Sequence, residues 1–159
     1  MCGIAGLLHL RGDGPRLGDA LTVLMDAQAH RGPDGSGVFV TDRVALGSTR
    51  LALVDLDGGG QPLASESGDV RLVANGELYG DDHERRALQT QGHRFATRSD
   101  CEVLVHRYEE HGLGFARGLR GMWGAALWDE RLERLVLARD PYGIKPLVYA
   151  VLPGEVVAF

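Results

Sequence analysis

The sequence predicts an α+β fold made of mostly antiparallel sheets with helices on their outer faces. Strand-like runs occur in adjacent pairs separated by short turns, as in antiparallel hairpins. Segments with helical spacing cluster between these pairs, which favours helices packed on the outside of the sheets. The first run, 3–10, is apolar on both faces, and this is typical of a strand buried between two layers.

Alternating and helical patterns assign elements along most of the chain. The expected strands are 3–10, 37–40, 44–54, 70–74, 122–128, 134–138, 147–151 and 155–159. Helical spacing predicts helices at 17–29 and 82–91. A third helix is expected to begin with Ser99 as N-cap and Glu102 in a capping box, and to end near Gly112. The last strand pair looks cut short, so we expect the chain to end inside an element.

Composition limits the partners of this chain of 159 residues, which has the size of one domain. A net charge of −5 and the lack of Lys/Arg stripes argue against nucleic acid or an anionic membrane as the main partner. No apolar run approaches the roughly 20 residues needed to cross a bilayer. The first residues do not resemble a signal peptide, so the cytoplasm is the expected location.

The cysteines and histidines suggest neither a disulfide nor a metal site. Cys2 and Cys101 form no CxxC pair, and a disulfide between them is disfavoured in a reducing cytoplasm. The six histidines are scattered, and a solvated surface role is the better interpretation of each. We therefore expect no metal ligands.

Cys2 is the first candidate for chemistry. A small second residue allows removal of Met1, and Cys2 would then carry both a thiol and a free α-amine. The amine has an ordinary pKa of about 7.7–8.0 and can act as a general base for the thiol. The alternative is that Cys2 is only a small apolar residue at the start of a strand.

Cys2 belongs to the first of several motifs along the chain. They are Met1-Cys2-Gly3-Ile4-Ala5-Gly6, His30-Arg31-Gly32-Pro33-Asp34-Gly35, Arg50-Leu51 through Val54-Asp55, Gly59-Gly60-Gln61-Pro62-Leu63, Asn75-Gly76-Glu77-Leu78-Tyr79, Ser99-Asp100-Cys101-Glu102-Val103, Gly121-Met122-Trp123 through Asp129, and Ala138-Arg139-Asp140 with Gly143-Ile144-Lys145-Pro146-Leu147. Block by block, this order resembles the N-terminal glutaminase domain of glutamine-hydrolysing asparagine synthetases. These domains are class II, or N-terminal nucleophile (Ntn), glutamine amidotransferases.

The resemblance implies a fold and a domain boundary. The implied fold is a four-layer αββα sandwich of the Ntn-hydrolase type. The implied domain is a type 2 glutamine amidotransferase domain over residues 1–159 that is truncated at its C-terminal end. The ATP-binding Ser-Gly-Gly-x-Asp-Ser motif of the synthetase domain does not occur, so ATP and Mg are expected only for that missing domain and no cofactor for this chain. One departure is Gly80, where the family usually has Asn.

The resemblance also assigns catalytic residues. Cys2 is implied as the nucleophile that forms a thioester intermediate, and the Asn75 side chain and Gly76 backbone N–H as the oxyanion hole. Without the resemblance, an Asn-Gly pair after a strand would indicate a hairpin turn.

Other residues are implied to bind the amino-acid end of glutamine. Arg50 would clamp the α-carboxylate and Asp100 the α-ammonium, and Leu53 and Glu77 would complete the substrate site. A solvated strand-end arginine and an acid favoured at a helix N-terminus are the alternatives for Arg50 and Asp100. A loop with His30, Arg31 and Asp34 is expected to have a structural role near the site.

The expected function is glutamine hydrolysis that supplies ammonia to an asparagine-synthetase domain or subunit, within amino-acid biosynthesis. The enzyme would be the glutaminase part of a ligase, and a homodimer is left open. A non-catalytic relic or docking module, and an N-terminal-thiol hydrolase of another amide, are the alternatives. The sequence leaves the ammonia acceptor undecided.

Overall fold

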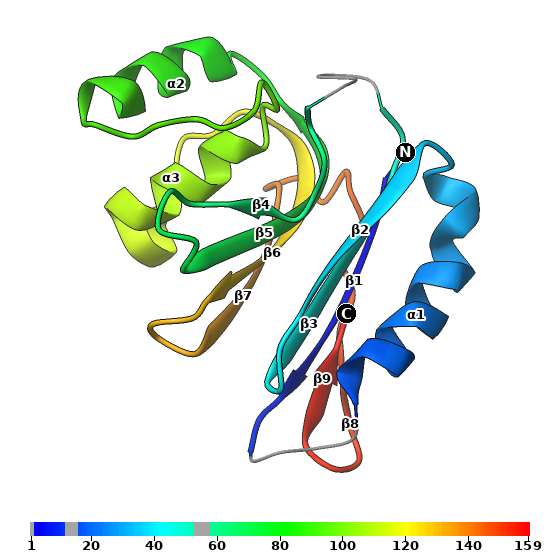
Figure 1. Ribbon diagram of the computed structural model, residues 1–159. Helices are drawn as coiled ribbons and strands as arrows, with labels where there is room; N and C mark the ends of the chain where they lie inside the picture. The colour runs from blue at the N-terminus through cyan, green and yellow to red at the C-terminus, as the bar shows by residue number, and fades with distance from the viewer. Residues whose placement is uncertain (1, 12–15, 53–57) are drawn as a thin grey trace.

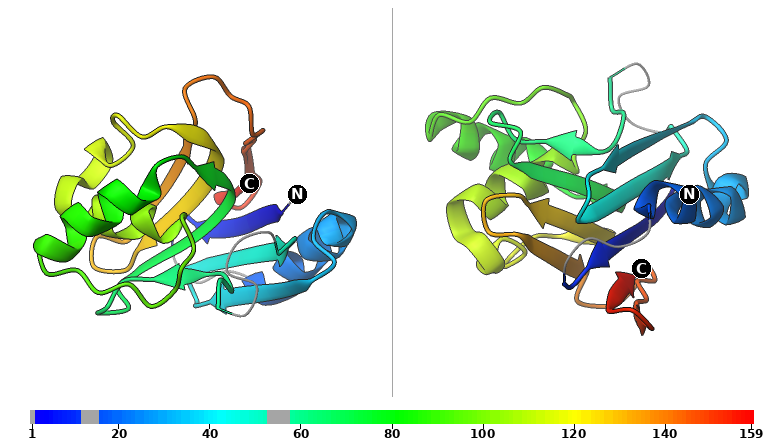
Figure 2. Two further views of the ribbon diagram at one scale, coloured as in Figure 1. Left: turned by 90° about the horizontal axis from the view of Figure 1, so that it is seen from above. Right: turned by 60° about the horizontal axis from the view of Figure 1, so that its bottom comes forward.

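Two antiparallel sheets lie face to face in the computed structural model, which describes residues 2–11, 16–52 and 58–159 (Figure 1). The strands are β1 (Gly3–His9), β2 (Gly35–Val40), β3 (Val44–Arg50), β4 (Leu63–Ala64), β5 (Val70–Leu78), β6 (Gly121–Asp129), β7 (Arg134–Arg139), β8 (Ala150–Leu152) and β9 (Val156–Ala158). The α-helices are α1 (Leu17–Gln28), α2 (Asp81–Thr90) and α3 (Glu102–His111). The two views of Figure 2 show α1 and the α2–α3 pair on opposite outer faces, so the predicted αββα sandwich is confirmed.

The first sheet has the strand order β2-β3-β1-β9-β8, and α1 covers its outer face. The apolar stripe Leu17, Leu21 and Met25 of α1 is buried against Ala5 of β1 and Ala45 of β3. The central position of β1 explains why its run is apolar on both faces, because one face meets α1 and the other meets the second sheet.

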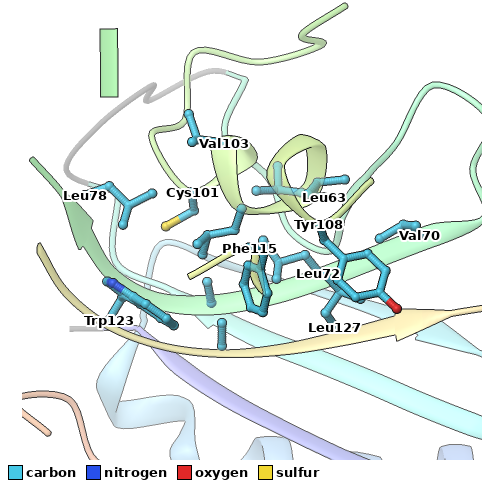
Figure 3. Packing of buried hydrophobic residues seen from close by; sticks show 14 of the residues in the cluster. Leu63, Val70, Leu72, Leu78, Cys101, Val103, Tyr108, Phe115, Trp123 and Leu127 are labelled. Carbon is cyan, nitrogen blue, oxygen red and sulfur yellow. The ribbon is translucent and has the colours of Figure 1, made fainter. Parts of the chain in front are cut away.

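The second sheet has the order β4-β5-β6-β7, and α2 and α3 cover its outer face. Figure 3 shows the cluster between this sheet and α3, in which Leu72 and Trp123 of the sheet face Tyr108 of α3 and the following Phe115. Tyr108 donates its hydroxyl to the buried Asp129 carboxylate at 3.0 Å, so its polar end is satisfied inside the core.

A third apolar cluster fills the space between the two sheets. It includes Leu8 of β1 and Leu46 of β3, which pack with Val73 of β5. Because successive side chains of a strand point to opposite faces, Leu72 points to the helices and Val73 to the first sheet. The same alternation directs Asn75 toward the first sheet.

The interpretation of Asn75-Gly76 as a hairpin turn is wrong, since β5 continues through both residues to Leu78 and pairs with β6 over its whole length. A Cβ on Gly76 would lie 2.2 Å from the Met122 carbonyl oxygen. Glycine is therefore needed for close packing of the strands, and pairing with β6 overrides the local turn preference.

The predicted capping box is also wrong. α3 follows Cys101, without a side-chain cap from Ser99. The Glu102 carboxylate instead accepts hydrogen bonds from the backbone N–H groups of Ala96 and Thr97, at 2.6 and 2.8 Å. Glu102 thus fixes the preceding segment rather than its own helix terminus.

Other element boundaries differ from the prediction by a few residues. β3 ends at Arg50 rather than at position 54, and residues 53 and 54 lie outside the described part. β8 begins at Ala150 rather than at 147, and the short strand β4 was not expected. Gly80 has φ = 73° before α2, a left-handed conformation that both Gly and Asn adopt, so this departure from the family fits the backbone.

The side chains of His9 and His106 are buried, so a surface role is wrong for them, whereas His30, His83 and His111 are exposed as expected. Both cysteines are free thiols, in agreement with the prediction against a disulfide. No helix in the described part of the chain has the length and apolar character needed to span a membrane.

Candidate active site

A cavity of about 100 Å³ gathers most of the predicted site residues. Cys2, Arg50, Asn75, Gly76 and Glu77 all line it. The cavity is also lined by Leu51, which follows Arg50 in the sequence, and by Ser99 and Cys101, which flank Asp100. Asp100 itself is buried beside the cavity rather than in its lining, and Leu53 lies outside the described residues.

Strand pairing explains why residues so distant in sequence meet here. Cys2 immediately precedes β1, and Arg50 ends β3, which pairs antiparallel with β1 so that Gly3 lies opposite Thr49. Asn75 lies in β5, whose inner face packs on this sheet. The nucleophile candidate and the oxyanion-hole candidates therefore come from opposing sheets.

Several contacts fix the backbone around Cys2. The Leu51 backbone N–H donates to the Cys2 sulfur at 3.4 Å, and the Arg31 Nε donates to the Cys2 carbonyl oxygen at 3.1 Å. The Thr49 hydroxyl oxygen accepts from the Gly3 N–H at 3.1 Å. The Asp34 carboxylate accepts from the Ala52 N–H at 2.8 Å. Arg31 and Asp34 thus order the chain near the cavity, as expected for that loop, while His30 is exposed.

Only one of the two thiols at the cavity is suited to nucleophilic chemistry. Cys101 is 3% exposed, and burial together with the negative charge of Asp100 raises the pKa of its thiol well above the usual range. A thiol held protonated in this way is a poor nucleophile. Cys2 is only half-buried and lines the cavity, so it is the better candidate.

Asp100 ties the loop before α3 to β5. Its Oδ2 accepts a hydrogen bond from the Leu78 N–H at 2.6 Å. Burial raises the pKa of Asp100, and the backbone hydrogen bonds from Leu78 and Cys101 offset this only in part. A buried carboxylate with a raised pKa is stabilised by a cation, so the arrangement is compatible with the predicted contact to an α-ammonium group.

Sequence reasoning assigned no role to Gln61, which supports the oxyanion-hole strand. Its side-chain amide donates to the Ala74 carbonyl oxygen at 3.0 Å and its Oε1 accepts from the Ala74 N–H at 2.6 Å. This paired contact holds β5 one residue before Asn75. The signal in the sequence that could have identified Gln61 was its position in the family motif Gly59-Gly60-Gln61-Pro62-Leu63.

Asp140 supports the part of the cavity lined by Lys145. Its carboxylate accepts four backbone N–H hydrogen bonds, and the donors are Trp123, Tyr142, Ile144 and Lys145. Burial alone would raise the pKa of Asp140, but these donors outweigh it and hold the pKa below the ordinary value. The loop that carries the cavity residue Lys145 is therefore fixed to β6.

An αββα sandwich with a cysteine immediately before its central strand is the arrangement expected of an Ntn hydrolase. A solved structure of glutamine phosphoribosylpyrophosphate amidotransferase from B. subtilis has the same fold, with a TM-score of 0.79, 22% identity, and coverage of 99% of this chain and 41% of that chain.

The sequence comparisons identify the family more narrowly. A family described as the glutamine amidotransferase domain matches residues 1–159. Asparagine synthetase [glutamine-hydrolyzing] 2 of Bacillus subtilis is 38% identical over 99% of this chain, and amidase chry2 of Gibberella zeae is 40% identical over 95%. This chain belongs to the glutamine amidotransferase domain family. It spans only 21% and 24% of the lengths of these two curated relatives.

Proposed function

We propose that this chain hydrolyses glutamine to glutamate and ammonia, with Cys2 as the nucleophile and a thioester as the intermediate. The observation that carries the proposal is the single cavity lined by Cys2, Arg50, Asn75, Gly76 and Glu77. A planar guanidinium suits the α-carboxylate of glutamine, and the acids Glu77 and Asp100 suit its α-ammonium. Leu53 is kept as a proposed substrate contact.

In the first half of the reaction, the Cys2 sulfur attacks the side-chain carbonyl carbon of glutamine. The α-amine of Cys2 accepts the thiol proton as the carbon–sulfur bond forms. Hydrogen bonds from the Asn75 side-chain amide and the Gly76 N–H stabilise the oxyanion, and each such donor contributes about 3–4 kcal/mol in comparable sites. The amine then gives the proton to the departing nitrogen, which leaves as ammonia.

In the second half, water attacks the thioester while the same amine accepts a proton from it. The carbon–sulfur bond breaks, glutamate is released, and the proton returns to the Cys2 thiolate. None of these steps requires a metal ion or an organic cofactor. We therefore still expect that glutamine hydrolysis by this chain needs no cofactor. ATP and Mg are expected only for a synthetase domain.

We further propose that the ammonia is used by a synthetase domain or subunit, in the same polypeptide or in a partner. The length of the curated relatives supports this, because most of each lies beyond the matched region. An exposed apolar surface on the chain from 142 to 152 is suited to such a contact. Its exposed members are Tyr142, Ile144, Val148, Tyr149, Val151 and Leu152. The cytoplasm stays the expected location.

The purified chain, incubated with glutamine, aspartate and ATP, is expected to release glutamate and ammonia in equal amounts and to form no asparagine. Its sequence has the glutaminase residues but no ATP-binding Ser-Gly-Gly-x-Asp-Ser motif. Enzymatic assays of glutamate and ammonia, with amino-acid analysis for asparagine, measure both outcomes. A Cys2→Ser chain serves as the control for contaminating glutaminase. Failure to release glutamate would favour a non-catalytic docking module. Asparagine formation would contradict the proposal that a synthetase domain or subunit uses the ammonia.

Arg50→Lys is expected to lower kcat/KM for glutamine at least about tenfold, mainly through KM, because one of two parallel hydrogen bonds to the α-carboxylate is lost. Steady-state kinetics on a folded variant measure this. Arg86→Lys is a matched control, since Arg86 is exposed on α2 and does not line the cavity. Unchanged kinetics for Arg50→Lys would remove Arg50 from the substrate site.

A further inference from the structure

Two histidines and two glutamates form a cluster that the proposed glutaminase chemistry does not use. They are Glu66 in the turn between β4 and β5, His93 after α2, and His106 and Glu109 on α3. Each offers one nitrogen or oxygen atom, and these four atoms lie within 4.8 Å of one another. None of the four residues lines the Cys2 cavity.

Four distances within the cluster are close to the edge length of a coordination tetrahedron. His106 Nδ1 lies 3.2 Å from Glu109 Oε2 and 3.5 Å from Glu66 Oε2. His93 Nδ1 lies 3.6 Å from both Glu66 Oε1 and Glu109 Oε2. Zinc–ligand bonds of about 2.0–2.1 Å place tetrahedral ligands about 3.3–3.4 Å apart. Binding of one ion by all four residues requires side-chain adjustments, because Glu66 approaches His93 with Oε1 and His106 with Oε2.

The outer nitrogens of both imidazoles face a second pair of carboxylates. His93 Nε2 lies 2.9 Å from Glu110 Oε1, and His106 Nε2 lies 3.6 Å from Glu102 Oε1. His106 is fully buried, and its Nε2 has no hydrogen-bond partner at that distance. Zinc-bound histidines characteristically direct the nitrogen opposite the metal toward a carboxylate, which orients the ring and sets its tautomer. His93 shows this arrangement at hydrogen-bond distance and His106 at 3.6 Å, each with Nδ1 toward the cluster.

We propose that His93, His106, Glu66 and Glu109 bind one Zn²⁺ ion, with Nδ1 of each histidine and one oxygen of each glutamate as ligands. Two imidazoles favour zinc over magnesium or calcium, which prefer oxygen ligands only. Four protein ligands make this a structural site. The proposal departs from the expectation that the chain has no metal ligands.

The ion would stabilise the connections around α3. It joins the β4–β5 turn, the segment after α2 and two turns of α3, three parts of the chain that are distant in sequence. The Glu102 carboxylate beside His106 already holds the N–H groups of Ala96 and Thr97. Zinc binding is therefore expected to stabilise the α3 side of the sandwich, which supports the second sheet.

Titration of the chelator-stripped chain with Zn²⁺ by isothermal calorimetry tests the proposal. We expect one equivalent of zinc per chain and a rise in Tm of about 5 °C at saturating zinc. X-ray absorption should show four nitrogen or oxygen donors at about 2.0–2.2 Å, with the multiple-scattering signature of imidazole and without sulfur. The Glu110→Gln variant should bind about 10–100-fold more weakly, because Glu110 orients a ligand.

Three variants complete the test. The combined variant His93→Ala with Glu109→Gln is expected to lose the zinc-induced rise in Tm while it keeps the far-ultraviolet circular dichroism of the parent chain. His111→Ala removes an exposed histidine at the end of α3 and should bind zinc as the parent does. Cys2→Ser should also keep one equivalent. The proposal is overturned by absence of saturable zinc binding, by loss of binding in Cys2→Ser, or by unchanged binding in the folded double variant.

Discussion

A chain that keeps Met1 is expected to fold but to lose glutamine hydrolysis by at least about 100-fold, the lower end of what a general base contributes. With Met1 attached, the nitrogen of Cys2 is part of an amide and cannot accept a proton near neutral pH. The Cys2 sulfur already lies near the Leu51 backbone in the cavity wall. An additional residue on the Cys2 nitrogen would also compete with glutamine for space there.

Intact-mass measurement paired with a glutaminase assay tests this prediction. Active preparations should lack Met1, and a chain with an N-terminal tag should show no turnover. Cleavage of such a tag to leave Cys2 as the first residue should restore activity, whereas the same cleavage in a Cys2→Ser chain should not. Robust turnover by a tagged chain of confirmed mass would mean that another group serves as the base, and the N-terminal nucleophile mechanism would have to be withdrawn.

Periodic patterns were sufficient for the sheets and the helix faces. The doubly apolar run became β1, the central strand on which α1 packs, and the two runs joined by 129–133 became the β6–β7 hairpin. These elements are determined by repeated burial of alternating or helically spaced side chains, a signal spread over many residues.

Local rules failed where competing hydrogen-bond partners decided the structure. Asn75-Gly76 has turn chemistry, but pairing with β6 keeps it extended. Ser99 and Glu102 have capping-box spacing, but Glu102 is drawn to the N–H groups of the segment before it. In both cases other backbone hydrogen-bond partners outweigh a local preference of about 1 kcal/mol.

The zinc cluster could not have been found by inspecting motifs, because its ligands are separated by irregular gaps and meet only through packing of α3 on the second sheet. The residues of the candidate active site, in contrast, could be predicted from the sequence. They lie within short family motifs, although the contacts that support them, such as that of Gln61 with Ala74, required the structure.

Asn75→Ala is expected to lower kcat for glutamine by about 100- to 1,000-fold while KM changes little. Asn75 is 6% exposed, lies on the inner face of β5 and lines the cavity with Cys2. Its side-chain amide can donate to the oxyanion that forms as the Cys2 sulfur attacks. An interaction that strengthens only in the transition state affects kcat rather than the binding of substrate.

Separate measurements of kcat and of ligand binding distinguish stabilisation of the oxyanion by Asn75 from a purely structural role. Calorimetric binding of the product glutamate should be retained in Asn75→Ala and weakened in Arg50→Lys, because only Arg50 is proposed to hold the α-carboxylate. Asn75→Asp keeps the shape of the side chain but replaces the donor with a carboxylate, so it should lose at least as much kcat as the alanine variant. If Asn75→Ala instead weakens glutamate binding and lowers Tm with kcat within about threefold of the parent, Asn75 supports the packing of β5 and the oxyanion hole must be formed by other donors.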